Sequence, residues 1–459
     1  MSPDSLKRCL SVFLSGGVLA VLLLLTACQN IRGTKILHAK TDPSFEYAWQ
    51  VLRDTYFDTN FHGLNWQGIH DELSPKAALT RSPDQLRPIL EDMLSRLGRS
   101  HLAIIPAARH SEPELGARTS AEMLLNKPVG SGTLGLGLRL LDSNLVVTAV
   151  TPHSSAANIG IKTGWTLQSI DGVNLPQLLA ELPSDHAFKK NSFLAWNLGE
   201  HAQRGDANSI ANVTLLDGAD QLQTLKVTRI ALPGQPVALG HFPPLHTLFT
   251  NRWLDTAVPQ RMGYIHFNFW MLPAGIAFDH AIEEMKSADG LVIDMRGNLG
   301  GLAAMVMGVG GHFVTNRQDL GVMLTRDNQL HLYANPRTVN PSGDSTQPYA
   351  GPLAILTDEI SASAAELFAG GMQSMGRARI FGRPTAGQAL PATFTKLPNQ
   401  DLLYHAFADF ILPNGLRLEA KGVIPDEWIP LRRSDLIDNR DAPLEAAVAW
   451  IKNRKSSAP

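Results

Sequence analysis

The segment GLVIDMRGNLGG, residues 290–301, decides the fold of this chain. Its first five residues form an apolar run typical of a buried strand, and a glycine-rich turn then leads into small residues as far as Met307. A strand-like segment at 262–267 precedes it, with a helix expected near 277–286. Strand, helix and strand in this order predict a right-handed crossover within an α/β layer.

The same arrangement recurs further along the chain. Residues 353–356 are predicted as a strand, 363–373 as a helix and 378–381 as another strand. Both turns follow the C-terminal ends of strands, where open α/β sheets place their sites. Ser363, within the ISASAAE segment at 360–366, stands at the expected helix N-terminus, where backbone N–H groups favour the negative charge of acyl transfer. Ser363 is therefore either a nucleophile or an ordinary N-cap, and only catalytic partners separate the two.

Upstream of this core the sequence pattern changes twice. Residues 43–97 carry apolar positions at helical spacing and predict a small helical domain that ends at Gly98. Residues 107–130 are mixed and polar without a sustained period, which indicates a linker and a candidate hinge. Strand-like alternation with glycine turns follows from Thr133, and it predicts a β-rich domain.

The N-terminus has the pattern of a lipoprotein signal peptide. A basic start precedes an apolar run at 12–25, and the run ends in Leu-Thr-Ala-Cys at 25–28, which resembles the lipobox of bacterial lipoproteins. The resemblance implies cleavage before Cys28, acylation of its thiol and attachment to a bilayer by acyl chains. Gln29 after the cysteine favours, by resemblance to sorting in Gram-negative bacteria, the outer membrane facing the periplasm. An uncleaved anchor or an ordinary secretory signal is the alternative.

Composition excludes several classes of protein. Cys9 and Cys28 are the only cysteines, so the mature chain has no disulfide, no Cys-ligated metal and no thiol nucleophile. The 40 basic and 42 acidic residues give a formal net charge of −2, and no basic stripe suggests nucleic acid. The turn at 296–301 lacks a phosphate-binding pattern, and no His-x-x-x-His or acidic cluster suggests a metal. We expect no cofactor, and the oligomeric state stays open.

Four short strings in the third block of the chain carry a family resemblance. They are Asp294-x-Arg296-x-Asn298-x-Gly300-Gly301, Ser-Ala-Ser at 361–363, Gly376-Arg377-Ala378 and Gly422-Val423-Ile424-Pro425-Asp426. Their order and spacing resemble the carboxyl-terminal processing (tail-specific) peptidases and the related tricorn core peptidases. The resemblance implies an α/β multidomain fold with an N-terminal helical domain, a PDZ-like β-rich domain and a crotonase-like ββα peptidase core.

The resemblance also implies a division of the chain. It gives a signal peptide at 1–27, a helical domain at 28–106, a linker at 107–130, a PDZ-like domain at 131–230, a linker at 231–260, the peptidase core at 261–432, and a C-terminal helix and tail at 433–459. A PDZ domain adds an extended peptide to a sheet edge and binds its carboxylate with loop amides, here those of Gly135, Leu136, Gly137 and Leu138. A generic β-rich domain is the alternative.

Within this family the nucleophilic serine falls on Ser363. The tail-specific branch pairs it with a lysine, but this chain has Gln388 at that position, and an amide is no general base at neutral pH. The tricorn-like branch uses instead a Ser-His pair from the helical domain, matched by Ser100 and His101, and a glutamate, matched by Glu419. The resemblance thus implies His101 as the base, oriented by Ser100 and Glu419.

The oxyanion hole is expected from the backbone N–H groups of Ala364 and Gly300, since glycine allows a substrate carbonyl to approach closely. The preferred hypothesis is an envelope-anchored serine endopeptidase that cleaves unstructured or C-terminal polypeptide segments through an acyl-enzyme. A catalytically silent PDZ scaffold is the second hypothesis, because of Gln388. A third possibility, ligand binding as in retinoid-binding relatives, has no specific support in the sequence.

Overall fold

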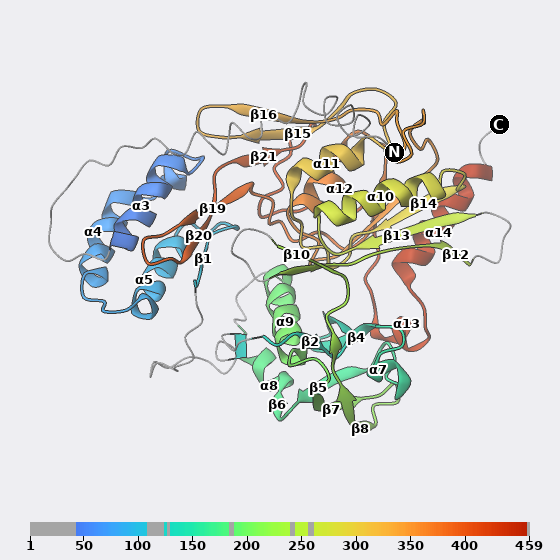
Figure 1. Cartoon of the computed structure of the whole chain (residues 1–459), viewed down its shortest axis with the longest axis horizontal. Coiled ribbons are helices and arrows are strands. Elements are labelled where there is room, and N and C mark those ends of the chain that lie inside the picture. Colours follow the sequence, from blue (N-terminus) through green and yellow to red (C-terminus); the bar gives the residue numbers. More distant parts are fainter. Residues whose placement is uncertain are drawn as a thin grey trace, which may run out of the picture.

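The computed structural model describes residues 43–107, 124–125, 129–182, 188–238, 244–255 and 261–456 (Figure 1). The predicted signal peptide, Cys28 and most of the predicted linker at 107–130 lie outside these residues. Within the described ranges, no helix combines the length and the apolar character needed to cross a bilayer.

A six-stranded sheet forms the centre of the molecule (Figure 1). In spatial order its strands are β12 (Phe249–Leu254), β13 (Met262–Phe267), β14 (Gly290–Asp294), β17 (Leu353–Thr357), β18 (Arg379–Gly382) and β22 (Glu427–Trp428). The strands from β13 to β22 run parallel, and β12 pairs antiparallel with β13. Every residue of β14 and β17 is buried, as expected for central strands of a parallel sheet.

Helices cover both faces of this sheet. Alternate strand residues divide between two apolar clusters: Ile293 and Ile355 pack with α10 (Leu272–Glu284), α11 (Ala303–Gly310) and α12 (Ala364–Ser374), whereas Val292 and Ala354 pack with α14 (Ala442–Ser456). The strands and helices predicted for both βαβ units are therefore present. Helix α10 begins earlier than predicted, since Pro273 is tolerated in a first helical turn.

The expected linker at 231–260 is wrong over its second half. Strand β12 pairs with β13 over six residues and forms the edge of the core sheet, so the core begins near Phe249. Before it, β10 (Gln235–Val237) and β11 (Leu245–Thr247) form a two-stranded ribbon. The sequence did not reveal β12 because its exposed face is polar and an edge strand needs only one buried face.

A second sheet belongs to the β-rich unit, residues 129–238. Its strand order is β3-β4-β5-β7-β8, and the elements are β3 (Leu136–Leu141), β4 (Asn144–Val150), α7 (Ser155–Asn158), β5 (Thr166–Ile170), α8 (Leu175–Ala180), α9 (Phe188–Gln203), β7 (Ile210–Leu216) and β8 (Leu222–Thr228). The unit has its own apolar core. Strand β3 lies at an edge of the sheet, and α9 packs beside it.

Three helices precede the β-rich unit: α3 (Pro43–Thr55), α4 (Trp66–Ala77) and α5 (Pro83–Ser95). The side chains of Asn65 and Ser82 accept hydrogen bonds from the first turns of α4 and α5, as N-caps do. The helices do not form an isolated domain. Their apolar core also contains residues of the hairpin β19 (Ala392–Lys396) and β20 (Leu402–Ala406), which the predicted boundaries assign to the peptidase core.

The hairpin β19–β20 ties the N-terminal helices to the rest of the chain. Strand β1 (Ala103–Ile105) pairs antiparallel with β20. Arg87 of α5 reaches the fully buried Asp401 carboxylate, with Nε 2.9 Å from Oδ2. The segment just before β1 is therefore fixed against the C-terminal half of the chain.

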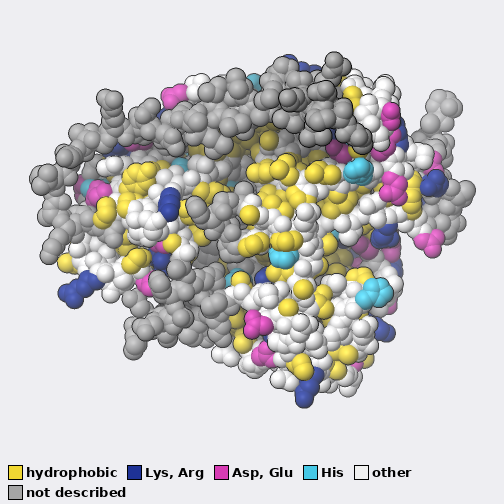
Figure 2. Space-filling view, in the orientation of Figure 1, with side chains coloured by type: hydrophobic (Ala, Val, Ile, Leu, Met, Phe, Trp, Pro, Cys, Tyr) yellow, Lys and Arg dark blue, Asp and Glu magenta, His cyan; other side chains and the backbone are white. Residues whose placement is uncertain are grey.

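A third sheet, β16-β15-β21, lies beside α11 and α12 (Figure 1). Its strands are β15 (Gln318–Leu324), β16 (Gln329–Ala334) and β21 (Asp409–Ile411). Figure 2 shows hydrophobic side chains gathered on the face that carries α10, and Leu272 and Ile276 of this helix are exposed.

Candidate active site

Ser363 lies in the turn between β17 and α12, at the N-cap position of the helix. Its backbone φ is 54°, in the left-handed region that a residue with a side chain adopts only when its surroundings hold it there. Ala362 and Ala364 on either side are buried, while Ser363 itself is partly exposed. The turn therefore presents the serine and hides its neighbours.

His101 is brought to the core by strand pairing. It precedes β1 by two residues, and Ala103 of β1 is opposite Tyr404 of β20. The imidazole packs against the Tyr404 ring, with 5.4 Å between the ring centroids. His101 also has a left-handed backbone, with φ 58°, which turns the chain sharply before β1.

Ser100, His101 and Glu419 form one hydrogen-bonded chain. Ser100 Oγ lies 2.7 Å from His101 Nδ1 and donates to Glu419 Oε2 at 2.9 Å, while the Ser100 N–H donates to Glu419 Oε1 at 2.9 Å. An ionised carboxylate only accepts, so the single hydroxyl hydrogen of Ser100 belongs to Glu419. Nδ1 of His101 must then carry a hydrogen and donate to Ser100 Oγ. In the neutral ring this leaves Nε2 with its lone pair, as a base requires.

The relay reaches the nucleophile turn through residues 385–389. The Ala389 N–H donates to Glu419 Oε2 at 3.1 Å, and the carbonyl of the preceding Gln388 accepts the Ser363 N–H at 2.8 Å. Glu419 and Ser363 thus contact the same short segment, and Ser100 and His101 are linked to it through Glu419. Ala420, which follows Glu419, is a third non-glycine residue with a left-handed backbone, at φ 64°.

Loss of water around the imidazole sets its protonation state. Burial lowers the pKa of His101 to about 4, which keeps the ring neutral at pH 7. Burial also raises the pKa of the adjacent Tyr404 phenol above its usual range, so that ring remains uncharged. The uncharged His101 imidazole, which is the candidate base, therefore packs against the uncharged Tyr404 ring.

The oxyanion turn differs in part from expectation. A Cβ placed on Gly300 would lie 2.6 Å from Ser363 Cβ and 3.0 Å from the Ala364 nitrogen, so the turn does lie against the nucleophile and only glycine fits. However, the Gly300 N–H already donates to Asn298 Oδ1 at 2.9 Å. The buried Asn298 side chain also donates to the Phe267 carbonyl. Gly300 can serve as an oxyanion donor only if this turn rearranges.

The predicted carboxylate nest at Gly135, Leu136, Gly137 and Leu138 is also occupied. The Leu136 N–H donates to Gln203 Oε1 at 3.2 Å, and Gln203 Nε2 donates to the Leu136 carbonyl at 3.0 Å. The Gly135 N–H lies 3.3 Å from Thr133 Oγ1. The loop lies at the free edge of β3, as predicted, but the α9 side chain of Gln203 takes the groups that a peptide would use.

Three functional candidates were missed by sequence reasoning: Asp358, Glu366 and Gln203. Asp358 directly follows β17, a strand-end position that could have singled it out. Glu366 stands three residues after Ser363, the spacing of a capping box. Gln203 has no local signal, because its partners lie far away in the sequence.

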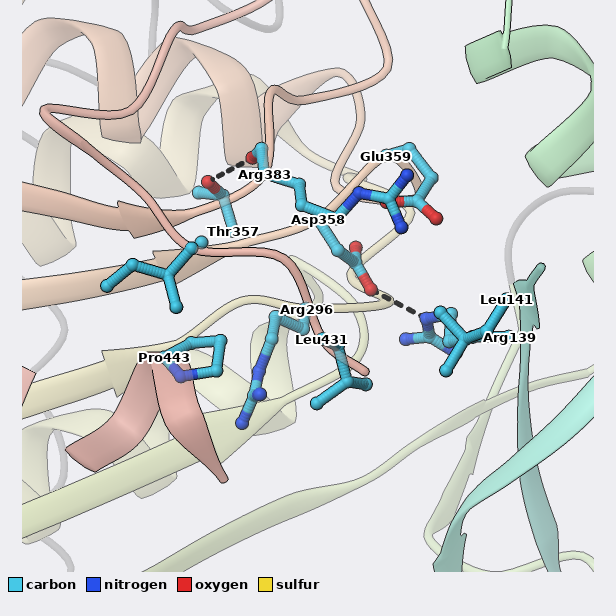
Figure 3. Close-up of a pocket in the computed structure, with 11 residues that line it drawn as sticks. Arg139, Leu141, Arg296, Thr357, Asp358, Glu359, Arg383, Leu431 and Pro443 are labelled. Carbon is cyan, nitrogen blue, oxygen red and sulfur yellow. Dashed lines mark hydrogen bonds and ion pairs between the residues drawn. The ribbon is translucent and has the colours of Figure 1, made fainter. Parts of the chain in front are cut away.

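A small cleft lies where β3 of the β-rich unit meets the core (Figure 3). Arg139 of β3 enters from one side, with Asp358 and Arg383 on the other. None of the four predicted catalytic residues lines it. Within the described part of the chain, no group of three His, Cys, Asp or Glu side chains could hold a metal.

Comparisons with known proteins show which peptidases the chain is similar to. Residues 261–429 match the peptidase family S41 model, and residues 38–95 match that of the tricorn protease C1 domain. The chain is 23% identical to a carboxyl-terminal-processing protease of Picosynechococcus sp., over 91% of this chain and 90% of the relative. It is also 23% identical to carboxyl-terminal-processing peptidase 3 of Arabidopsis thaliana, over 83% of this chain and 67% of the relative.

A solved structure gives the same result for the fold. The photosystem II D1 C-terminal processing protease aligns with 88% of this chain and 95% of its own, with a TM-score of 0.54 and 23% identity. The likeness therefore extends beyond the core sheet to most of the molecule.

Proposed function

We propose, because this chain is a serine peptidase of the carboxyl-terminal processing group with a peptidase family S41 core, that it cleaves unstructured or C-terminal polypeptide segments. In this proposal a Ser-His-Ser-Glu relay takes the place of a Ser-Lys dyad. The observation that carries this proposal is the chain from His101 Nδ1 through Ser100 Oγ to Glu419, with distances of 2.7 and 2.9 Å. The tricorn C1 match over residues 38–95 supports the same branch.

The proposed reaction follows from the protonation states. Ser363 Oγ attacks the scissile carbonyl while its proton moves to His101 Nε2. The new imidazolium is stabilised through Ser100 by the Glu419 carboxylate. The oxyanion accepts a hydrogen bond from the Ala364 N–H at the start of α12, where the helix dipole also favours negative charge. His101 then gives the proton to the leaving amine, and water hydrolyses the acyl-enzyme by the reverse transfers.

A fluorophosphonate probe tests the nucleophile and the base directly. It should label the wild type at Ser363, and Ser363→Ala should abolish labelling. His101→Ala should slow labelling by about 100-fold or more, within the range of a lost general base. His331→Ala is the matched control, because His331 pairs with an aspartate on the surface hairpin β15–β16. Labelling of His101→Ala at the wild-type rate would contradict the proposed base.

The β-rich unit serves as a PDZ domain in this proposal. Peptide would add to the free edge of β3, beside α9, and its chain would be delivered to Ser363. An unfolded polypeptide such as casein should be cleaved, whereas a stably folded protein of similar size should not. Equal cleavage of both would contradict a preference for unstructured segments.

Envelope anchoring is proposed from the lipobox-like sequence alone. Cys28 would carry the acyl chains and hold the enzyme at the outer membrane, facing the periplasm. Metabolic labelling with an alkyne fatty acid should mark the wild type and not Cys28→Ser. A labelled Cys28→Ser protein would contradict this site.

A silent scaffold is the second candidate function, and Gln388 is the observation that favours it. This residue occupies the lysine position with its backbone held against Ser363. The scaffold would bind peptide equally well with Ser363→Ala and would cleave no unfolded substrate. Any cleavage that depends on Ser363 would exclude it.

A further inference from the structure

Glu366 is a fully buried acid with four hydrogen-bond donors around its carboxylate. Oε1 accepts from Thr385 Oγ1 at 2.6 Å and from the Gly387 N–H at 2.7 Å. Oε2 accepts from the Gln388 N–H at 2.9 Å and from the Ser363 N–H at 3.1 Å. One carboxylate therefore holds both the nucleophile turn and the segment 385–389.

The same segment is held on its other side by the relay. Its Ala389 N–H binds Glu419, and its Gly387 carbonyl accepts the Ala420 N–H at 2.8 Å. Thr385 bonds Val423 in both directions, through its own N–H at 3.1 Å and its hydroxyl at 2.6 Å. Segment 385–389 thus lies between the nucleophile and the group that orients the base.

We propose that Glu366 is a positioning residue that sets the register between Ser363 and His101, by fixing segment 385–389 against the nucleophile turn. This role rests on the proposed function, because it presupposes that Ser363 and His101 react together. A misplacement of about 1 Å can cost about 100-fold in rate, so loss of the clamp should lower turnover far more than peptide binding.

The charge state of Glu366 supports this role. Burial raises its pKa to about 7, and its four donors favour the ionised form. The clamp needs that form, because a protonated oxygen cannot accept all four bonds. Activity should therefore fall as the pH drops through about 7.

The ionisable groups around Glu366 have other partners and do not take over its role in binding segment 385–389. Of the elements packed against α12, α11 carries no ionisable residue. Strand β15 carries Asp319, which pairs with His331, and β18 carries Arg379, which pairs with Glu427. Across segment 385–389 the neighbours are Glu419 and, through Ser100, His101.

Substitution of Glu366 by glutamine tests the proposal, because the amide keeps the shape but loses acceptors. Glu366→Gln should slow fluorophosphonate labelling of Ser363 and lower kcat on casein by about 100-fold, with KM changed less than about two-fold. Thr385→Val removes one of the four donors to Glu366 and also the acceptor of the Val423 N–H, and it should cost about 10-fold in kcat. Asp279→Asn is the control: this acid of α10 pairs with His312 and Arg337, and its substitution should leave kcat unchanged.

The pH profile separates positioning from simple loss of stability. Wild-type labelling should show an inflection near pH 7, and Glu366→Gln should lack it over about pH 6 to about pH 8. Thermal unfolding of each variant verifies that it is folded at the assay temperature. Labelling of folded Glu366→Gln within about three-fold of wild type, or an unchanged inflection, would overturn the role of Glu366 alone. Absence of labelling at Ser363 in the wild type would instead overturn the proposed function, and this inference with it.

Discussion

Arg139 Nε lies 2.6 Å from Asp358 Oδ2, and this ion pair joins the β-rich unit to the core (Figure 3). The other Asp358 oxygen accepts the Gly297 N–H at 2.9 Å and the Ser361 N–H at 3.1 Å. One acid therefore fixes the oxyanion turn and the nucleophile turn, while its partner comes from β3. Arg139 also donates to the Leu138 carbonyl, within the predicted peptide loop.

Removal of Arg139 should destabilise the molecule strongly. Burial would raise the pKa of Asp358, but the Arg139 guanidinium and the N–H donors outweigh it and hold that pKa below its usual range. Arg139→Ala leaves a buried charge unpaired, so the free energy of unfolding at pH 7 should fall by about 3 kcal/mol. The exposed pair Arg440–Glu445 is the control, and Arg440→Ala should cost less than about 1 kcal/mol. Equal losses of unfolding free energy in the two variants, measured by urea unfolding, would contradict a stabilising role for the Arg139–Asp358 ion pair.

Gln203 makes a second prediction possible, on peptide binding. Its side chain takes both the N–H and the carbonyl of Leu136 at the edge of β3. Gln203→Ala frees these groups and should tighten binding of a C-terminal peptide by about 10-fold. This is the size of effect expected when a peptide no longer competes with an internal hydrogen bond. Fluorescence anisotropy with a labelled peptide measures this. Unchanged or weaker binding in a folded variant would show that peptides do not use this edge.

Much of the core could be predicted from the sequence, because its signals are local. The apolar runs at β14 and β17 and the small-residue helix after Ser363 lie within a few residues of their turns. The hairpin β19–β20 could not be placed in this way. Its apolar residues pack against helices some 300 positions earlier, and periodicity carries no information on such a partner.

The candidate site likewise contains residues that could be predicted and residues that could not. The family resemblance implied Ser100, His101, Glu419 and Ser363 as catalytic candidates, and hydrogen bonds link the first three in the structure. The Gln203 side chain, which occupies the Leu136 backbone groups expected to be free, could not be predicted, whereas the bond from the Gly300 N–H to Asn298 spans two residues and is a local Asx pattern. Hydrogen bonds between a side chain and a distant backbone group depend on the tertiary structure and not on a sequence period.

Acid should act on the stability of the fold through three histidines, of which His312 and His405 are buried and His101 is partly buried. Burial lowers the pKa values of His101, His312 and His405 to about 4, below the ordinary value of about 6.5. Between these values each of these histidines binds a proton in the unfolded chain and not in the folded chain, so the histidine contribution to stability falls as the pH drops from about 6.5 to about 4, while Glu366 with its raised pKa contributes in the opposite direction. Each histidine contributes up to about 1.4 kcal/mol per pH unit. Urea unfolding of His405→Gln should show a flatter dependence over this window, and an unchanged slope would contradict the burial effect.

Gly387 provides the sharpest test of segment 385–389, because the chain offers a matched control. Gly387 and Gly376 both have a left-handed backbone, with φ 74° and 69°. A Cβ on Gly387 would lie 2.9 Å from the Ala420 carbonyl carbon and 3.0 Å from the Lys421 nitrogen, whereas one on Gly376 would meet nothing within 4 Å. Both alanine variants carry the backbone strain of about 1 kcal/mol, but only Gly387→Ala pushes the segment away from the turn that bears Glu419.

Gly387→Ala should therefore lose about 100-fold or more in Ser363 labelling, while Gly376→Ala should stay within about three-fold of wild type. Both variants should unfold at similar urea concentrations if the displaced segment relaxes locally. Activity that falls equally in the two variants would mean that strain, and not the contact with Ala420, limits the enzyme. Activity retained by Gly387→Ala would show that the relay tolerates movement of segment 385–389, and the alignment of Ser363 with His101 would then have to come from another contact.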